Sequence, residues 1–442
     1  MTPDLTLPGQ TSSVPKAVAK GDKHIWGIYL ALCLVSIIEL YSASSREVAA
    51  SSIGVFGPIL RHLVLLGAGA GITIYISRIH YSRFKVFTIY FAMISAALMI
   101  YVMFFGDIIN GARRSVSLPG FTVFPAEMVK ISAVLLVALI MGQNQDSKSI
   151  GITKKGMLWA AGTIIFFSAL LIEQGLTNTL LLVAISGSMM VIGGVKWLDL
   201  IYFVAGFAVL GVIGLAVLYL VDIKGAERAE IPADAEQVEM TGSTHQSRSR
   251  IATWLARLDR HDNDSVAKWE LPATGNYRQE VLSYAAQAHG GIHGVGPGNS
   301  REASRLPLAF SDYIYAIVVE ELGMIGGIGV LLLYLWLLGR ASGIASRCTR
   351  TYPALLVIGM AVMIAFQALF HMGIVTGYFP VSGQPLPLIS KGGTSIVVTC
   401  IAFGIMLSVS RTATRRTNTR AEQEDERDAL PDDLNSENRM QL

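Results

Sequence analysis

The sequence predicts an all-α integral membrane protein with about ten transmembrane helices and a large extracytoplasmic loop before the eighth. Of the 442 residues, 52% are hydrophobic and only 15% are charged, and the mean hydropathy is +0.50. Runs of about twenty apolar residues recur along the chain, which is the length of α-helix that crosses a bilayer. A soluble domain rarely combines these features, so we expect a polytopic membrane protein.

The apolar runs give the expected spans. They are residues 25–44, 57–77, 85–104, 124–142, 154–172, 176–195, 199–221, 313–338, 354–377 and 386–410. We expect a cytosolic tail (1–23), transmembrane helices 1–7 (24–221), the large extracytoplasmic loop (222–311), helices 8–10 with a re-entrant Pro/Gly segment (312–410) and a disordered cytosolic tail (411–442). Basic residues such as Arg78, Lys154 and Arg347 fall on the side of both termini, which places both termini in the cytosol. No cleavable signal sequence is expected, because the first span is long enough to stay in the membrane.

The composition excludes several kinds of partner and cofactor. The net charge of +3 is too small to indicate nucleic-acid binding. Cys33, Cys348 and Cys400 are widely spaced and none lies in the large loop, so no disulfide framework is expected there. The chain has neither a nucleotide-binding loop nor histidines and cysteines at metal-ligand spacing. No organic cofactor is therefore predicted.

A charged residue, Asp312, stands where the large loop meets the eighth span. Glu320 and Glu321 follow inside the first turns of the same span. An ionised side chain at that depth costs roughly 2.5–3.5 kcal/mol on insertion scales, so such residues face a protein interior or a wet cavity. We therefore expect other functional groups to gather around Asp312.

Two pairs of charged residues are candidates for binding an anionic substrate. Arg113 and Arg114 lie in a short outer loop, against the usual bias of basic residues toward the cytosol, so they either hold a ligand or extend to lipid headgroups. Glu127 and Lys130 share one face of the fourth span because they are three residues apart. Either they form a structural ion pair, or Lys130 contacts the substrate while Glu127 orients it or binds a divalent cation.

The segment from Pro380 to Ser395 contains three prolines and three glycines, so it cannot form a plain helix. Irregular backbone at membrane depth is tolerated only against protein or a water-filled cavity. We expect this segment to re-enter toward the outer cavity and to present Ser390, Lys391 and Thr394 to a substrate. A simple helix-breaking turn is the alternative.

Two features of the large loop have structural or functional interpretations. Residues 245–260 carry apolar side chains at helical spacing among arginines, which predicts an amphipathic helix on the outer membrane face or over the protein's own core. Residues 290–299 are rich in glycine, which suits either the close approach of a ligand or a tight turn.

These motifs together resemble the SEDS family (shape, elongation, division, sporulation), whose members FtsW and RodA polymerise peptidoglycan glycan strands. The resemblance runs from about Trp26 to Arg411. It rests on residues 110–114, 124–130, 290–299, 306–323 and 380–395. Residues 297–300 and 389–395 are more similar to FtsW than to RodA.

The resemblance implies a peptidoglycan glycosyltransferase that polymerises lipid II outside the cytoplasmic membrane during cell division, with inversion at the transferred sugar. It implies that Asp312 is catalytic and acts as general base on the acceptor hydroxyl. Arg113, Arg114, Lys130 and Lys391 would match the charge of the lipid diphosphate, with assistance from a divalent cation, Mg or Mn. It also implies a class B penicillin-binding protein with transpeptidase activity as partner, together with other division-complex membrane proteins.

Three places depart from the family pattern. Ser115 follows the arginines where tryptophan is usual, and Lys391 stands where tyrosine is common. Residues 173–179 lack an aspartate, which Glu173 would have to replace. These changes affect the local electrostatics more than the reaction class. Two other functions stay open, a lipid II transporter and a non-catalytic scaffold for division proteins, because a translocation path would also need many spans and buried charges.

Overall fold

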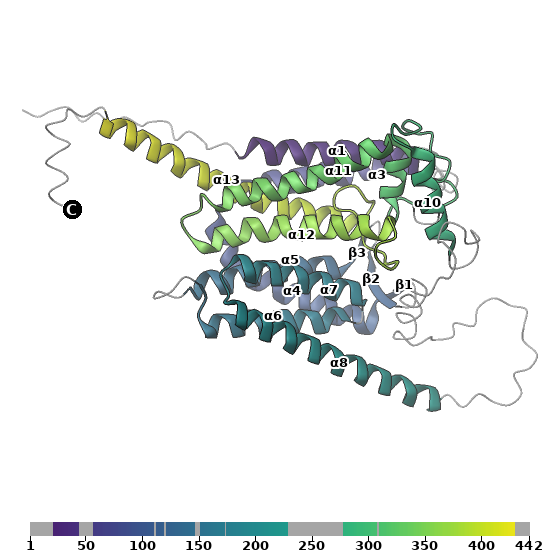
Figure 1. Cartoon of the computed structure of the whole chain (residues 1–442), viewed down its shortest axis with the longest axis horizontal. Helices are drawn as coiled ribbons and strands as arrows, with labels where there is room; N and C mark the ends of the chain where they lie inside the picture. Colours follow the sequence, from purple (N-terminus) through teal and green to yellow (C-terminus); the bar gives the residue numbers. More distant parts are fainter. Residues whose placement is uncertain are drawn as a thin grey trace, which may run out of the picture.

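The structure is a computed structural model, and it describes residues 21–43, 56–109, 112–118, 121–145, 151–172, 174–228, 277–306 and 309–428. Its long helices run side by side along the longest dimension of the molecule, while α8 leans away from the others (Figure 1). The predicted helical membrane fold is confirmed. By length and composition, seven helices among the described residues are apolar enough to cross a membrane, and α7 is a shorter apolar helix.

Each expected span coincides with a helix. These helices are α1 (Lys23–Ala43), α3 (Phe56–Arg78), α4 (Phe84–Phe105), α5 (Pro125–Gln143), α6 (Lys154–Ile172), α7 (Leu176–Ile192), α8 (Trp197–Arg228), α11 (Ile314–Ala345), α12 (Thr351–Val375) and α13 (Gly393–Asp428). Between α8 and α11 lies the shorter α10 (Arg278–Gly290). A 3-10 turn at Tyr81–Arg83 precedes α4.

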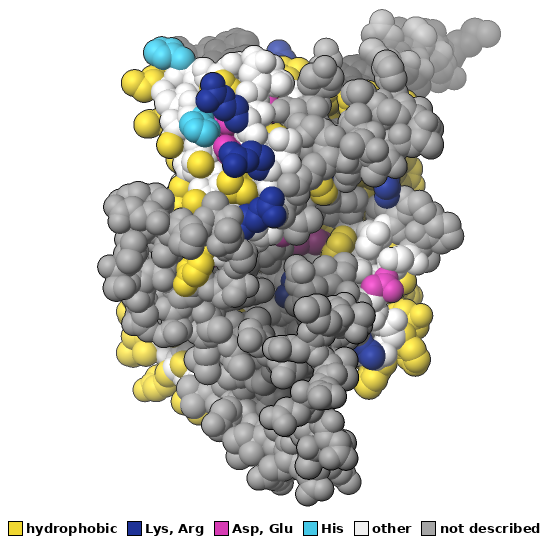
Figure 2. Space-filling model, turned by 90° about the vertical axis from the view of Figure 1, so that its right-hand side faces the viewer, with side chains coloured by type: hydrophobic (Ala, Val, Ile, Leu, Met, Phe, Trp, Pro, Cys, Tyr) yellow, Lys and Arg dark blue, Asp and Glu magenta, His cyan; other side chains and the backbone are white. Residues whose placement is uncertain are grey.

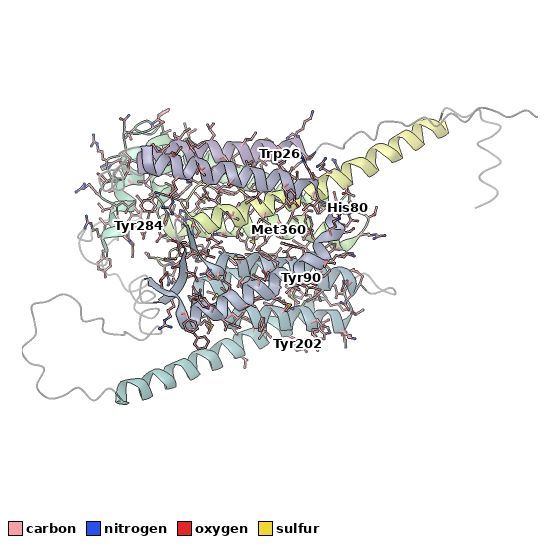
Figure 3. All side chains as sticks on the ribbon, turned by 180° about the vertical axis from the view of Figure 1, so that it is seen from behind. Trp26, His80, Tyr90, Tyr202, Tyr284 and Met360 are labelled. Carbon is pink, nitrogen blue, oxygen red and sulfur yellow. The ribbon has the colours of Figure 1, made fainter. Side chains whose placement is uncertain are left out.

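Three helices, α5, α12 and α13, form the centre of the bundle. Of the residues in their apolar windows, 78% in α5 and α12 and 83% in α13 are buried, against 22% in α3. Met360 of α12 lies inside, whereas Tyr90 of α4 and Tyr202 of α8 are 63% and 72% exposed on the periphery (Figure 3). Extensive exposed apolar surface of this kind is typical of contact with lipid.

A small antiparallel sheet lies between α4 and α5, where only a loop was expected. It consists of β1 (Asp107–Ile109), β2 (Ala112–Leu118) and β3 (Phe121–Val123), in the order β1-β2-β3. The dipeptides Asn110-Gly111 and Pro119-Gly120 separate these strands in the sequence, and both are turn signals. The fold is therefore mostly helical, with a sheet that the all-α prediction omitted.

The glycine-rich stretch after α10 packs against a break in α11. The break lies at Gly323, which has a φ of 72°. The main-chain N–H of Gly296 donates to the Glu321 carbonyl at 2.9 Å, and a Cβ on Gly294 would lie 2.1 Å from that oxygen. Glycine is needed here because the two backbones touch. Of the two interpretations, the structure shows a tight backbone packing.

Several expected boundaries need correction. The last helix begins at Gly393 rather than at residue 386, because the proline-rich stretch before it is irregular. The tail after Arg411, expected to be disordered, is helical as far as Asp428, and it is rich in the good helix formers Arg, Glu and Gln. The amphipathic segment predicted at 245–260 lies outside the described residues.

Buried glutamates are a feature of the bundle near the start of α11. Glu320 and Glu321 are 0% and 1% exposed, so the expectation that they face a protein interior is confirmed. Glu39 of α1 is also fully buried, and neither of its carboxylate oxygens has a hydrogen-bond partner. A buried polar group without such a partner costs free energy.

We expect Glu39→Leu to stabilise the protein by about 1–3 kcal/mol, because it removes an unpartnered buried carboxyl group. Ser36, one turn earlier on α1, is the matched control. Its hydroxyl contacts His62 Nε2 at 2.8 Å and donates to the Ile389 carbonyl at 3.2 Å, so Ser36→Ala should be destabilising. Thermal unfolding of the detergent-solubilised variants measures both, and a lower melting temperature for Glu39→Leu would contradict the prediction.

Candidate active site

Asp312 lies two residues before the first residue of α11, and its side chain is half-buried. Its Oδ1 accepts a hydrogen bond of 2.6 Å from Ser311 Oγ. A Cβ on Gly383 would lie 3.0 Å from Oδ2, so the absence of a side chain at Gly383 allows the Pro/Gly segment to pass directly beside the carboxylate. The structure thus brings the catalytic candidate together with the segment expected to re-enter.

Arg114 on β2 is the predicted basic residue whose charge acts on Asp312. Burial raises the pKa of Asp312 above its usual value of 3.8, and the hydrogen bond from Ser311 and the positive charge of Arg114 offset only part of this rise. A Cβ on Gly175 would lie 4.0 Å from Arg114 Nη2. Arg114 therefore lies beside the start of α7 and near enough to Asp312 to stabilise its ionised form.

Arg113 has a different role in this structure. Its Nη1 donates to the main-chain carbonyls of Met103, at 3.4 Å, and Phe104. These carbonyls belong to the last turn of α4, where free acceptors and the negative end of the helix dipole favour a cation. Successive side chains of a strand point to opposite faces, which explains why the two neighbouring arginines of β2 separate. The structure does not bring Arg113 to Asp312.

Glu127 and Lys130 form a buried ion pair in the first turns of α5. Lys130 Nζ lies 2.7 Å from Glu127 Oε1, and their side chains are 1% and 10% exposed. Gln367 of α12 joins this pair to the Pro/Gly segment, since its Nε2 lies 3.3 Å from both Glu127 Oε2 and the Pro385 carbonyl. The pair is structural in its contacts and supports the segment that passes Asp312.

Ser390, Lys391 and Thr394 hold neighbouring protein segments. Ser390 Oγ donates to the Ser311 carbonyl at 2.8 Å, and the main-chain N–H of Lys391 donates to the Phe310 carbonyl at 2.9 Å. Lys391 Nζ lies 5.2 Å from the centre of the Phe310 ring. Thr394 Oγ1 donates at 3.0 Å to the central carbonyl of β3. These three residues fix the chain before Asp312 and the sheet in place.

Four polar residues near the site were missed by the sequence analysis. Gln384 Nε2 donates to Asn178 Oδ1 at 3.0 Å, and the Gln384 carbonyl accepts from His371 Nδ1 at 2.6 Å. Gln174 Nε2 donates to the Arg113 carbonyl at 2.6 Å, which ties β2 to the turn before α7. Asn178 and His371 interrupt apolar runs, and polar residues inside spans are a usable signal of function.

The surroundings of the Glu127 carboxylate do not form a binding site for the divalent cation that the sequence suggested. One carboxylate oxygen already faces the Lys130 ammonium and the other accepts from an amide. Within the described ranges, no group of three His, Cys, Asp or Glu side chains could hold a metal ion. The contacts of Glu127 therefore suit a lysine ammonium rather than a divalent ion.

The end of the bundle that carries Asp312 also has an exposed basic rim. Its members lie on α10 and in the segment that follows: Arg278, His289, His293, Arg301 and Arg305. Figure 2 looks onto this end and shows Lys, Arg and His side chains gathered on one side of it. A positive rim raises the local concentration of an anionic substrate.

A family model described as "Cell cycle protein", that of FtsW, RodA and SpoVE, matches residues 22–415. The chain belongs to the FtsW/RodA/SpoVE family.

The structure describes Ser115, one of the positions at which this family member departs from the family pattern. Ser115, a residue of β2, is 0% exposed, so it occupies a packing position and not a surface on which a sugar could stack. Glu173 lies outside the described residues.

Relatives of this FtsW/RodA/SpoVE family member cover nearly its whole length. Stage V sporulation protein E of Bacillus subtilis (strain 168) is 29% identical over 390 residues, which are 87% of this chain and 95% of that protein. A protein named "Probable peptidoglycan glycosyltransferase FtsW" from Geobacter metallireducens is 28% identical over 401 residues, 89% of this chain and 96% of the relative.

Solved structures show the same fold as this family member. RodA of Thermus thermophilus has a TM-score of 0.58 and 20% identity, and the match covers 90% of this chain and 99% of RodA. A chain from a peptidoglycan synthase complex has a TM-score of 0.60 and 20% identity, with 89% of this chain and 98% of the other covered.

Proposed function

We propose that this protein is a peptidoglycan glycosyltransferase that polymerises lipid II at the outer face of the cytoplasmic membrane, with Asp312 as general base. The observation that carries the proposal is a half-buried carboxylate at the end of an apolar bundle, facing the charge of Arg114. Its relatives named probable peptidoglycan glycosyltransferase FtsW support the reaction class. Membership of this family supports a role in cell division or a related morphogenetic process.

In the proposed reaction, Asp312 takes the proton from the acceptor sugar's 4-hydroxyl group, and that oxygen attacks the anomeric carbon of the donor sugar. The bond from this carbon to the lipid diphosphate breaks, and the diphosphate leaves with the electron pair. Arg114 stabilises the developing negative charge, because a guanidinium group matches phosphate oxygens in geometry and charge. Because the reaction is a single displacement at the anomeric carbon, it inverts the anomeric configuration.

The proposed orientation follows from the location of the reaction. Lipid II polymerisation occurs outside the membrane, so the end with Asp312 and the basic rim faces outward, and both termini are cytosolic, as the basic residues predict. We further propose a class B penicillin-binding protein as partner, because one structural neighbour is part of a peptidoglycan synthase complex.

The decisive experiment is polymerisation of labelled lipid II by the purified protein, with and without this transpeptidase and with and without Mg²⁺ or Mn²⁺. Glycan chains on a denaturing gel support the proposal. If the protein moves lipid II across the membrane of liposomes but forms no glycan chains under any of these conditions, the transporter function would replace the proposed glycosyltransferase function.

The polymerisation rate should fall as the pH is lowered, because protonated Asp312 cannot act as a base. The midpoint of this fall should lie above the usual aspartate pKa of 3.8, because burial raises the pKa of Asp312. Arg114 lowers this pKa, so Arg114→Gln should move the acid limb to still higher pH. Arg113→Gln is the matched control, since Arg113 contacts the end of α4. The pH–rate profiles of the two variants test this, and identical acid limbs would contradict it.

A further inference from the structure

The carboxylate of Glu320 holds a segment of chain that lies outside its own helix. Glu320 is 0% exposed. Its Oε1 accepts from the main-chain N–H groups of Arg301 at 3.0 Å and Glu302 at 3.4 Å. Its Oε2 accepts from the hydroxyl of Ser300. One buried carboxylate therefore gathers three donors from residues 300–302, and hydrogen bonds to an ionised acceptor are the stronger kind.

The segment held by Glu320 is a compact turn. Ser300 Oγ accepts from the N–H of Ala303 at 3.0 Å, in the manner of a helix N-cap. The Glu302 carbonyl then accepts from Arg305 at 3.0 Å and from Leu306 at 2.8 Å. We name residues 300–306 the capped turn.

Other ionisable side chains lie close to Glu320 and Glu302. His289 Nδ1 of α10 lies 3.7 Å from Glu320 Oε1 and 3.8 Å from Glu302 Oε1. Arg305 Nη1 lies 3.2 Å from Glu302 Oε1. The backbone of Glu320 binds the preceding glycine-rich stretch instead, because its carbonyl accepts from the N–H of Val295 at 3.0 Å. The capped turn is thus bound to α11 through the side chain of Glu320.

Asp312 follows closely after the capped turn. Its other neighbours are already fixed, because Ser390 and Lys391 bind the carbonyls of Ser311 and Phe310 at 2.8 and 2.9 Å. On the N-terminal side, the capped turn ends at Leu306, so only five residues separate it from Asp312 in the sequence. Movement of the turn would therefore be transmitted to Asp312.

We infer that Glu320 is a positioning residue for Asp312, acting through the capped turn. The inference rests on the proposed function, in which Asp312 is the general base. A catalytic group that is misplaced by about 1 Å loses on the order of 100-fold in rate, while substrate binding elsewhere is retained. Glu320 therefore affects turnover rather than affinity.

The test compares Glu320→Ala with two substitutions at Ser300 in the full-length protein, together with whichever partner activates it. We expect Glu320→Ala to lower kcat on the order of 100-fold with KM for lipid II nearly unchanged. Ser300→Ala should also lower kcat, and Ser300→Thr should restore it because threonine keeps the hydroxyl group. Glu39→Gln, which removes a buried carboxylate without hydrogen bonds, should leave kcat unchanged.

Two results would overturn the inference. One is a wild-type kcat in folded Glu320→Ala. The other is equal loss in Ser300→Thr and Ser300→Ala, and this pair decides the question by itself if Glu320→Ala does not fold. Asp312→Asn in the same assay separates the inference from the proposed function. If Asp312→Asn polymerises lipid II, the general-base assignment fails, whereas an inactive Asp312→Asn beside a fully active Glu320→Ala removes only the positioning role.

Discussion

Replacement of Asp312 by asparagine should abolish glycan polymerisation while leaving the protein folded. Asparagine has nearly the same shape and keeps an oxygen that accepts the hydrogen bond from Ser311, but it cannot take a proton from the acceptor hydroxyl. Loss of a general base typically costs about 10²–10⁴-fold in rate. Gel analysis of chains formed from labelled lipid II measures this loss.

The stability of the same variant provides an internal control. Because the folded-state pKa of Asp312 is raised, the folded protein holds its proton to higher pH than the unfolded chain does. The ionised side chain therefore destabilises the fold once the pH exceeds that pKa. Asp312→Asn removes this charge, so its melting temperature at neutral pH should equal or exceed that of the wild type. Full activity in such a folded variant would exclude Asp312 as the base.

Replacement of Lys130 by methionine should cause the largest loss of stability. It leaves the Glu127 carboxylate without its partner at 2.7 Å, in a site where Lys130 is 1% exposed. Breaking a buried ion pair from one side typically destabilises a protein by about 3–5 kcal/mol. Thermal unfolding in detergent and the yield of folded protein should both fall.

The double variant Lys130→Met with Glu127→Gln distinguishes a structural role from a substrate contact. Removing both charges leaves no uncompensated ion, and such replacements are often neutral for stability. If the pair only supports the segment that passes Asp312, the double variant should recover both stability and polymerisation. Recovered stability with lost polymerisation would instead assign Lys130 to substrate binding.

Much of the site was predictable because membrane helices obey a strict rule. Charged residues such as Asp312, Glu127 and Lys130 stand out against apolar runs, since burying them requires a partner or a function. The two-residue turn signals around β2 were equally visible, yet the sheet was missed because its strands are short and lie between two dominant helices. Asn178 and His371 were missed because uncharged polar residues interrupt an apolar run less clearly.

The sequence by itself determined the helical membrane architecture and the family, and it predicted Asp312 as the catalytic candidate, because hydropathy and local motifs are properties of contiguous residues. Only the tertiary structure decided that Arg114 and not Arg113 faces Asp312, that Ser390, Lys391 and Thr394 bind protein groups, and that Glu320 anchors the capped turn. The reason is physical: each of these contacts joins segments that are distant in the chain or depends on which way a side chain points, and neither is encoded in the order of neighbouring residues.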